Sequence, residues 1–89
     1  MNRELLTNIS EQLQQLKGTL EKEDGHSIKS ISVSEEYNKD GCLVPGLSIL
    51  YSDDIKSNKF VLIDLVERAV NRNVQWFRFS PKGWFFFFE

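Results

Sequence analysis

The sequence predicts a small α+β domain in which a four-stranded antiparallel sheet packs against helices, in the order α-β-β-α-β-β. Three observations lead to this prediction. Two segments carry apolar residues at helical spacing, two pairs of segments carry strand residues, and a turn sequence joins each pair. The chain has 89 residues, 40% of them hydrophobic, which fits a single domain spanning residues 1–89.

The first expected element is a helix from about Arg3 to Lys17. Its apolar residues recur at steps of three and four, at Leu6, Ile9, Leu13, Leu16 and Leu20. Asn2 can cap the amino end, and Gly18 is where we expect the helix to weaken or stop. Residues 20–27 are charged and lack an apolar rhythm, which predicts a loop. A coiled-coil pairing through the same leucines is the alternative. The pattern lasts barely two heptads, however, and this short length favours packing on the chain's own sheet.

Residues 31–52 are expected to form a hairpin. Serines alternate with three residues that should share the buried parity of the first strand, Ile31, Val33 and Tyr37. The turn Asn38-Lys39-Asp40-Gly41 ends in a glycine that tolerates positive φ. The return strand, Cys42 to Ser52, should bury Leu47, Ile49 and Tyr51. Because proline cannot donate to a sheet ladder, Pro45-Gly46 predicts a bulge, and an edge position or a bend for this strand.

A second helix is expected from about Asn58 to Asn71, capped by Ser57 or Asn58. Its core positions would be Leu62, Leu65, Val66, Ala69 and Val70. The alternative is a strand through residues 60–66, because Phe60-Val61-Leu62-Ile63 is also typical of an extended segment. That alternative would give an amino-terminal helix followed by a small five-stranded barrel.

The last segment predicts a hairpin of Val74–Phe79 and Trp84–Glu89 around the turn Ser80-Pro81-Lys82-Gly83. Eight of the fourteen residues from Trp76 onward are aromatic, and they fill both parities of the final strand. Two interpretations follow. Either both faces of the strand are covered, or one face presents an apolar patch to a partner or to a second copy of the chain.

Charge is unevenly distributed along the chain, although the net charge is only −2. Residues 1–54 contain five Lys or Arg against ten Asp or Glu, whereas residues 55–89 contain six against three. Three cations of the second half, Arg72, Arg78 and Lys82, could gather as a basic rim beside the aromatic residues. An acidic arm at Glu35 and Glu36 could instead steer a partner.

Catalytic, cofactor and metal sites are not expected, and we predict that the chain is not an enzyme. It contains one cysteine, Cys42, and one histidine, His26, and the predicted hairpin keeps these two apart. Its acidic pairs lack the spacing of a calcium loop. The sequence also lacks a membrane-length apolar run and a signal-peptide pattern, which favours a cytoplasmic location without a membrane partner.

These exclusions favour a non-enzymatic protein-binding module, of the inhibitor, immunity or adaptor type, that acts through the aromatic carboxyl-terminal hairpin. The expected partner is another protein or, in a homodimer, a second copy of the chain. The predicted contact residues are Trp76, Arg78, Lys82, Trp84, Phe86, Phe88 and Arg72. The alternative is single-stranded nucleic-acid binding by the same aromatic residues with Arg72, Arg78 and Lys82, which the net negative charge disfavours.

Overall fold

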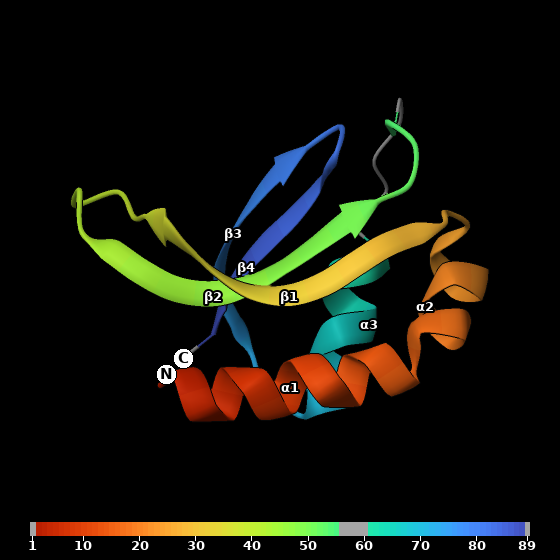
Figure 1. The fold of residues 1–89 in the computed structure, drawn as a ribbon, viewed down its shortest axis with the longest axis horizontal. Coiled ribbons are helices and arrows are strands. Elements are labelled where there is room, and N and C mark those ends of the chain that lie inside the picture. The colour runs from red at the N-terminus through yellow and green to blue at the C-terminus, as the bar shows by residue number, and fades with distance from the viewer. Residues whose placement is uncertain (1, 56–60, 89) are drawn as a thin grey trace.

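A computed structural model describes residues 2–55 and 61–88. The elements in these residues are α1 (Arg3–Gln15), α2 (Lys17–Asp24), β1 (Ile28–Tyr37), β2 (Leu43–Tyr51), α3 (Val61–Val70), β3 (Val74–Ser80) and β4 (Gly83–Phe88). The strands form one sheet in the order β1-β2-β4-β3, and every neighbouring pair is antiparallel. The predicted small α+β domain is confirmed, with one helix more than the sequence indicated (Figure 1).

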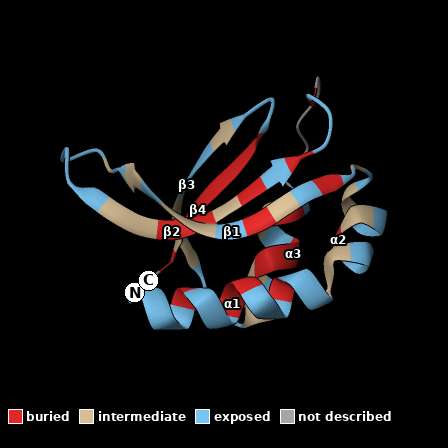
Figure 2. Ribbon diagram, viewed as in Figure 1, coloured by how far each residue is buried: buried red, intermediate tan, exposed pale blue. Residues whose placement is uncertain are grey.

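The helices lie on one face of the sheet, and the core fills the space between the two layers (Figures 1 and 2). The helices contribute Leu6, Ile9, Leu13, Leu20, Leu62, Leu65 and Val66, and the strands contribute Ile28, Ile31, Leu47, Ile49, Tyr51, Trp84, Phe86 and Phe88. Burial of apolar surface on this scale is the main force that holds the two layers together.

Helix α1 follows the prediction closely. Asn2 caps it, because the Asn2 Oδ1 atom accepts a hydrogen bond from the Leu5 backbone N–H at 2.8 Å. Its buried face packs against the sheet, and Ser10 Oγ and Gln14 Nε2 both donate to the Ile31 carbonyl of β1. These bonds tie α1 to one edge of the sheet.

The loop expected over residues 20–27 is wrong for residues 20–24, where the chain forms α2. The first helix ends at Gln15 with Leu16 as its C-cap, and Gly18 lies inside α2 rather than at the end of α1. Leu20 is the buried residue that anchors α2 to the core. Gly25, at φ 82°, ends this helix and donates its N–H to the Glu21 carbonyl.

The first hairpin is confirmed at its turn. Gly41 has φ 79°, and Asn38 Oδ1 accepts from the N–H groups of Asp40 and Cys42. The three residues expected to be buried on the return strand, Leu47, Ile49 and Tyr51, are buried. Tyr37 is not, since 63% of it is exposed where β1 runs beyond the helices.

The predicted bulge at Pro45-Gly46 is wrong, because the register between β1 and β2 continues through both residues. Strand β2 is also an inner strand rather than an edge. Its pairing with β4 covers only Leu47–Leu50, so Pro45 lies before that pairing begins, in a part of the strand that curves (Figure 1). Gly46 has a different reason to be glycine, because a Cβ there would lie 2.4 Å from the Cζ atom of Phe85.

The second predicted helix is confirmed over Val61–Val70, and the strand alternative is wrong for residues 61–66. Leu62, Leu65 and Val66 are buried, and Ala69 and Val70 pack partly buried beside them. The caps considered at Ser57 and Asn58 lie outside the described residues. With four strands in the described sheet, the five-stranded barrel is not formed.

The second hairpin is confirmed, with Pro81 and Lys82 in the turn between β3 and β4. The turn is tied to the end of β2, because the Pro81 and Lys82 carbonyls accept from the backbone N–H groups of Ile55 and Tyr51. These bonds hold β4 in the middle of the sheet and leave β3 at its edge.

Candidate binding surface on the open face of the sheet

The two parities of β4 face different environments. Trp84, Phe86 and Phe88 point toward the helices and are at most 3% exposed. Their assignment as contact residues is therefore corrected: they are core residues, because the helical layer covers them. Phe85 and Phe87 lie on the opposite side of the strand, where Phe85 is buried and Phe87 is half-buried.

We call that opposite side the open face; its residues are Ser48, Leu50, Trp76, Arg78, Phe85 and Phe87. Trp76 on the edge strand β3 contacts both phenylalanines of this face. The ring centroid of Trp76 lies 5.6 Å from that of Phe85 and 5.6 Å from that of Phe87, and the planes of Trp76 and Phe87 are 24° apart. The Phe85 ring fits against the bare backbone of Gly46. Three aromatic side chains are thus held in fixed positions on a surface that lies away from the helices.

Arg78 crosses the open face from β3 toward the far end of β1. Its Nη2 atom donates to the Tyr37 carbonyl at 3.1 Å, and its Nη1 atom lies 3.7 Å from Glu36 Oε2. The Arg78 side chain remains 55% exposed. Because β1 and β3 are the two edge strands, this contact shows how far the sheet curls around its open face.

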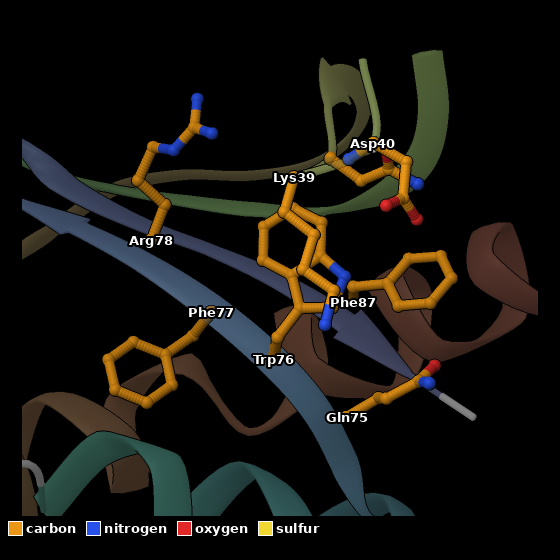
Figure 3. Close-up of a pocket in the computed structure, with 8 residues that line it drawn as sticks. Lys39, Asp40, Gln75, Trp76, Phe77, Arg78 and Phe87 are labelled. Atoms are coloured by element: carbon orange, nitrogen blue, oxygen red, sulfur yellow. Dashed lines mark hydrogen bonds between the residues drawn. The ribbon is translucent and has the colours of Figure 1, made fainter. Parts of the chain in front are cut away.

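Two clefts flank Arg78, and Arg78 lines both. The larger, about 470 Å³, lies between the turn of the first hairpin and β3, and its lining comprises Asn38, Lys39, Asp40, Gln75, Trp76, Phe77, Arg78 and Phe87. Figure 3 shows Lys39 and Asp40 on one side of the Trp76 and Phe87 rings, and Phe77 directed to the other side of β3. The smaller, about 140 Å³, is lined by Glu36, Ser48, Leu50, Arg78, Ser80, Gly83, Trp84 and Phe85.

The basic rim expected from the sequence does not gather at this surface. Arg72 precedes β3 and Lys82 follows it, so a seven-residue strand, about 23 Å when extended, separates them. Arg72 lines a separate shallow hollow beside Asp64 and Glu67. Of the three predicted cations, Arg78 alone lines the clefts of the open face.

The positions of several residues on this surface could not be predicted from the sequence. The alternation of β4 puts Phe85 and Phe87 on one parity, but the sequence does not indicate which face of the sheet that parity occupies. Lys39 and Asp40 belong to the predicted turn of the first hairpin, and the sequence does not indicate that β3 approaches that turn. Glu36 belongs to the predicted acidic arm, and its approach to Arg78 is visible only in the structure.

The other chemistry-bearing side chains that the structure describes lie apart from the open face. His26 and Cys42 are separated by the length of β1, and the His26 ring packs edge-on against Tyr51 at a centroid distance of 5.7 Å. The Tyr51 hydroxyl donates to Asp24 Oδ2 at 3.0 Å and accepts from Trp84 Nε1 at 2.8 Å. Burial, together with the nearby Asp24 charge, raises the pKa of Tyr51. Within residues 2–55 and 61–88, no three His, Cys, Asp or Glu side chains group as metal ligands.

Comparisons of the chain with models of protein families, with curated proteins and with solved structures found no match. None of the helices in the described part of the chain combines the length and apolar character of a membrane span. Function is therefore inferred from the geometry of the open face.

Proposed function

We propose that this protein is a non-enzymatic binding module, of the inhibitor, immunity or adaptor type, which occupies the surface of another protein with its open face. One observation supports the proposal above the others. Trp76 and Phe87 present aromatic surface to a cleft of about 470 Å³, and Arg78 stands at the border of that cleft. Aromatic residues and arginine provide most of the binding energy in protein interfaces.

The rigidity of the surface also supports this role. Trp76 lies on a strand and stacks on Phe87, and both strands belong to the sheet that the core supports. A side chain that is already ordered loses little conformational entropy when a partner covers it, whereas a flexible side chain loses about 0.5–1.5 kcal/mol. The open face is thus organised for contact before a partner arrives.

The charges around the larger cleft are mixed. Lys39 and Arg78 carry positive charge there, and Asp40 carries negative charge. A polar rim of both signs around an aromatic centre is typical of a protein interface. Single-stranded nucleic acid is the less supported ligand, because Arg72 and Lys82 lie at opposite ends of β3 and do not extend a basic track along the aromatic residues.

The test is to select a library of random-sequence peptides against the immobilised full chain and to measure the affinity of the enriched peptides for variants. Trp76→Ala should weaken binding at least about tenfold, which is within the range for a central aromatic contact. Leu43→Ala is the matched control, since Leu43 is an exposed apolar residue that lines neither cleft. It should leave the affinity unchanged.

Circular dichroism of Trp76→Ala separates lost binding from lost folding. If Trp76→Ala is folded and binds the enriched peptides as tightly as the wild type, or if selection enriches no peptide, the open face is not a protein-binding surface. An oligonucleotide that binds tightly at low salt, and weakens steeply as salt rises, would instead support the nucleic-acid alternative.

A further inference from the structure

Glu36 lies on β1 where Arg78 reaches across the open face, and one of its carboxylate oxygens is incompletely paired. The Glu36 Oε2 atom is buried, and no group among the described residues donates a hydrogen bond to it. Arg78 Nη1 is 3.7 Å away, which is too long for a hydrogen bond, and Arg78 Nη2 donates to the Tyr37 carbonyl instead. Since buried carboxylate oxygens are normally hydrogen-bonded, this atom marks a position that a further donor would satisfy.

Glu36 lines the smaller cleft, whose other walls suit an extended aliphatic chain. Leu50 and Phe85 direct apolar side chains to this cleft, whereas Trp84, which also borders it, turns its ring toward the helices, and the cleft has a volume of about 140 Å³. At about 30 Å³ per water molecule, that volume holds about five waters, or one long side chain in their place. The side chains of lysine and arginine combine an apolar stem with a cationic donor at the tip.

We infer that the partner of this protein inserts a lysine or arginine side chain into the smaller cleft, where its cation displaces the Arg78 guanidinium and donates to Glu36 Oε2, which is buried in the free protein. This inference rests on the proposed function and adds the chemistry of the partner. The stem of the inserted side chain packs against Leu50 and Phe85. The partner is therefore a protein segment with a basic residue next to the group that contacts Trp76.

An acidic segment fits this cleft less well. A partner carboxylate would approach Arg78, but Arg78 already donates to the Tyr37 carbonyl. Glu36 Oε2 would also still lack a donor.

The test is an amide-resolved NMR titration of the full chain with N-acetyl-argininamide. N-acetyl-citrullinamide, which is neutral and of similar shape, and N-acetyl-glutamate amide are the comparison ligands. We expect saturable shifts at Ser48, Leu50 and Phe85, with an affinity about tenfold higher for the arginine derivative than for the citrulline derivative, since a charged hydrogen bond provides at least that factor.

Variants locate the contact. Glu36→Gln should weaken the arginine derivative about tenfold, because the carboxylate is lost while the size of the side chain is kept. Glu35→Gln is the matched control, since Glu35 pairs with Arg3 of α1, and it should leave the affinity unchanged. Arg78→Ala removes the cation that competes for Glu36 and should tighten binding of the arginine derivative.

Other results overturn the inference. These are an absence of saturable shifts, equal binding of the arginine and citrulline derivatives, or binding of the glutamate derivative that Arg78→Ala abolishes. If these occur while the peptides enriched from the library still depend on Trp76, the basic partner is wrong and the protein-binding function stands. If the arginine derivative binds but no enriched peptide depends on Trp76, the proposed function fails instead.

Discussion

Individual residues connect the layers of this fold, and Tyr51 is the clearest case. Its hydroxyl joins Asp24 at the end of α2 to the indole N–H of Trp84 on β4, while its own strand, β2, lies between them in the sequence. Each polar atom in this chain of contacts has its partner, which is the condition under which a buried polar group stabilises a fold. The network fixes the orientation of the Trp84 ring in the core.

Replacing Tyr51 with phenylalanine should therefore destabilise the protein. Trp84 Nε1 would lose its acceptor in a buried position, and the expected loss is about 1–3 kcal/mol in the free energy of unfolding, measured by urea denaturation. Tyr37→Phe is the control, because Tyr37 is exposed, and should change stability by less than about 0.5 kcal/mol. Equal effects of the two substitutions would contradict the role of the Tyr51 network.

The same residue predicts how stability depends on alkaline pH. Because the pKa of Tyr51 is raised in the folded state, the unfolded chain ionises first, and folding loses stability as pH rises above the unfolded value of 10.0. The wild type should lose up to about 1.4 kcal/mol more per pH unit above that value than Tyr51→Phe does. The unfolded pKa lies within the range of about pH 9 to about pH 11. Parallel stability curves for the two proteins over that range would refute this linkage.

Gly46 predicts a second effect at the residue scale. A Cβ atom at this position would lie 2.4 Å from Phe85 Cζ and 2.5 Å from the Phe86 carbonyl oxygen. Gly46→Ala should therefore displace the Phe85 ring and destabilise the protein by about 1–3 kcal/mol. Gly18→Ala is the opposite control, because the site is open and helical, and it should stabilise the protein by up to about 1 kcal/mol in the same denaturation experiment. A neutral Gly46→Ala would show that the open face tolerates repacking.

At the scale of elements, the sequence predicted the helices and strands whose apolar residues recur at a regular spacing. Helix α1 and the turn residues Asn38 and Gly41 follow from spacing and backbone chemistry. Helix α2 was missed because it buries one residue, Leu20, and is otherwise charged, so its stability comes from that tertiary contact and from its cap at Gly25 rather than from a pattern.

The position of strands in the sheet was harder to predict than their existence. Pro45 argued for an edge because it cannot donate, but β2 pairs with β4 only beyond that residue. The face of β4 was likewise ambiguous, since both parities are aromatic. Which parity faces the helices depends on how β4 pairs with β2 and β3, and local sequence does not contain that information.

The element-scale prediction is that the two tryptophans have different roles. Trp84→Ala should cost about 3–5 kcal/mol in the free energy of unfolding, because it leaves a cavity in the core and removes the bond to Tyr51. Trp76→Ala should cost about 1 kcal/mol, the value of its aromatic contacts on the open face. Urea denaturation of both variants measures this difference in the free energy of unfolding. Equal losses would contradict the assignment of Trp84 to the core and Trp76 to the open face.

At the scale of the whole molecule, the charge asymmetry of the sequence is partly resolved within the fold. Arg78 of the basic second half approaches Glu36 of the acidic first half at 3.7 Å, whereas the pair of Arg3 with Glu35 lies within the acidic half. The curl of the sheet brings its edge strands together over the open face and creates the two clefts. This meeting of β1 and β3 joins residues 41 positions apart, which no local pattern predicts.

The central claim is that the open face, which includes Trp76, binds a protein partner while Trp84 belongs to the core. The most direct measurement is an amide-resolved NMR map of the full chain bound to a peptide enriched from the random library. The account predicts shifts concentrated on Trp76, Arg78, Phe87 and the turn residues Lys39 and Asp40. Shifts centred on the exposed surfaces of α1 and α2 would contradict it, because the binding surface would then lie on the helical side of the molecule.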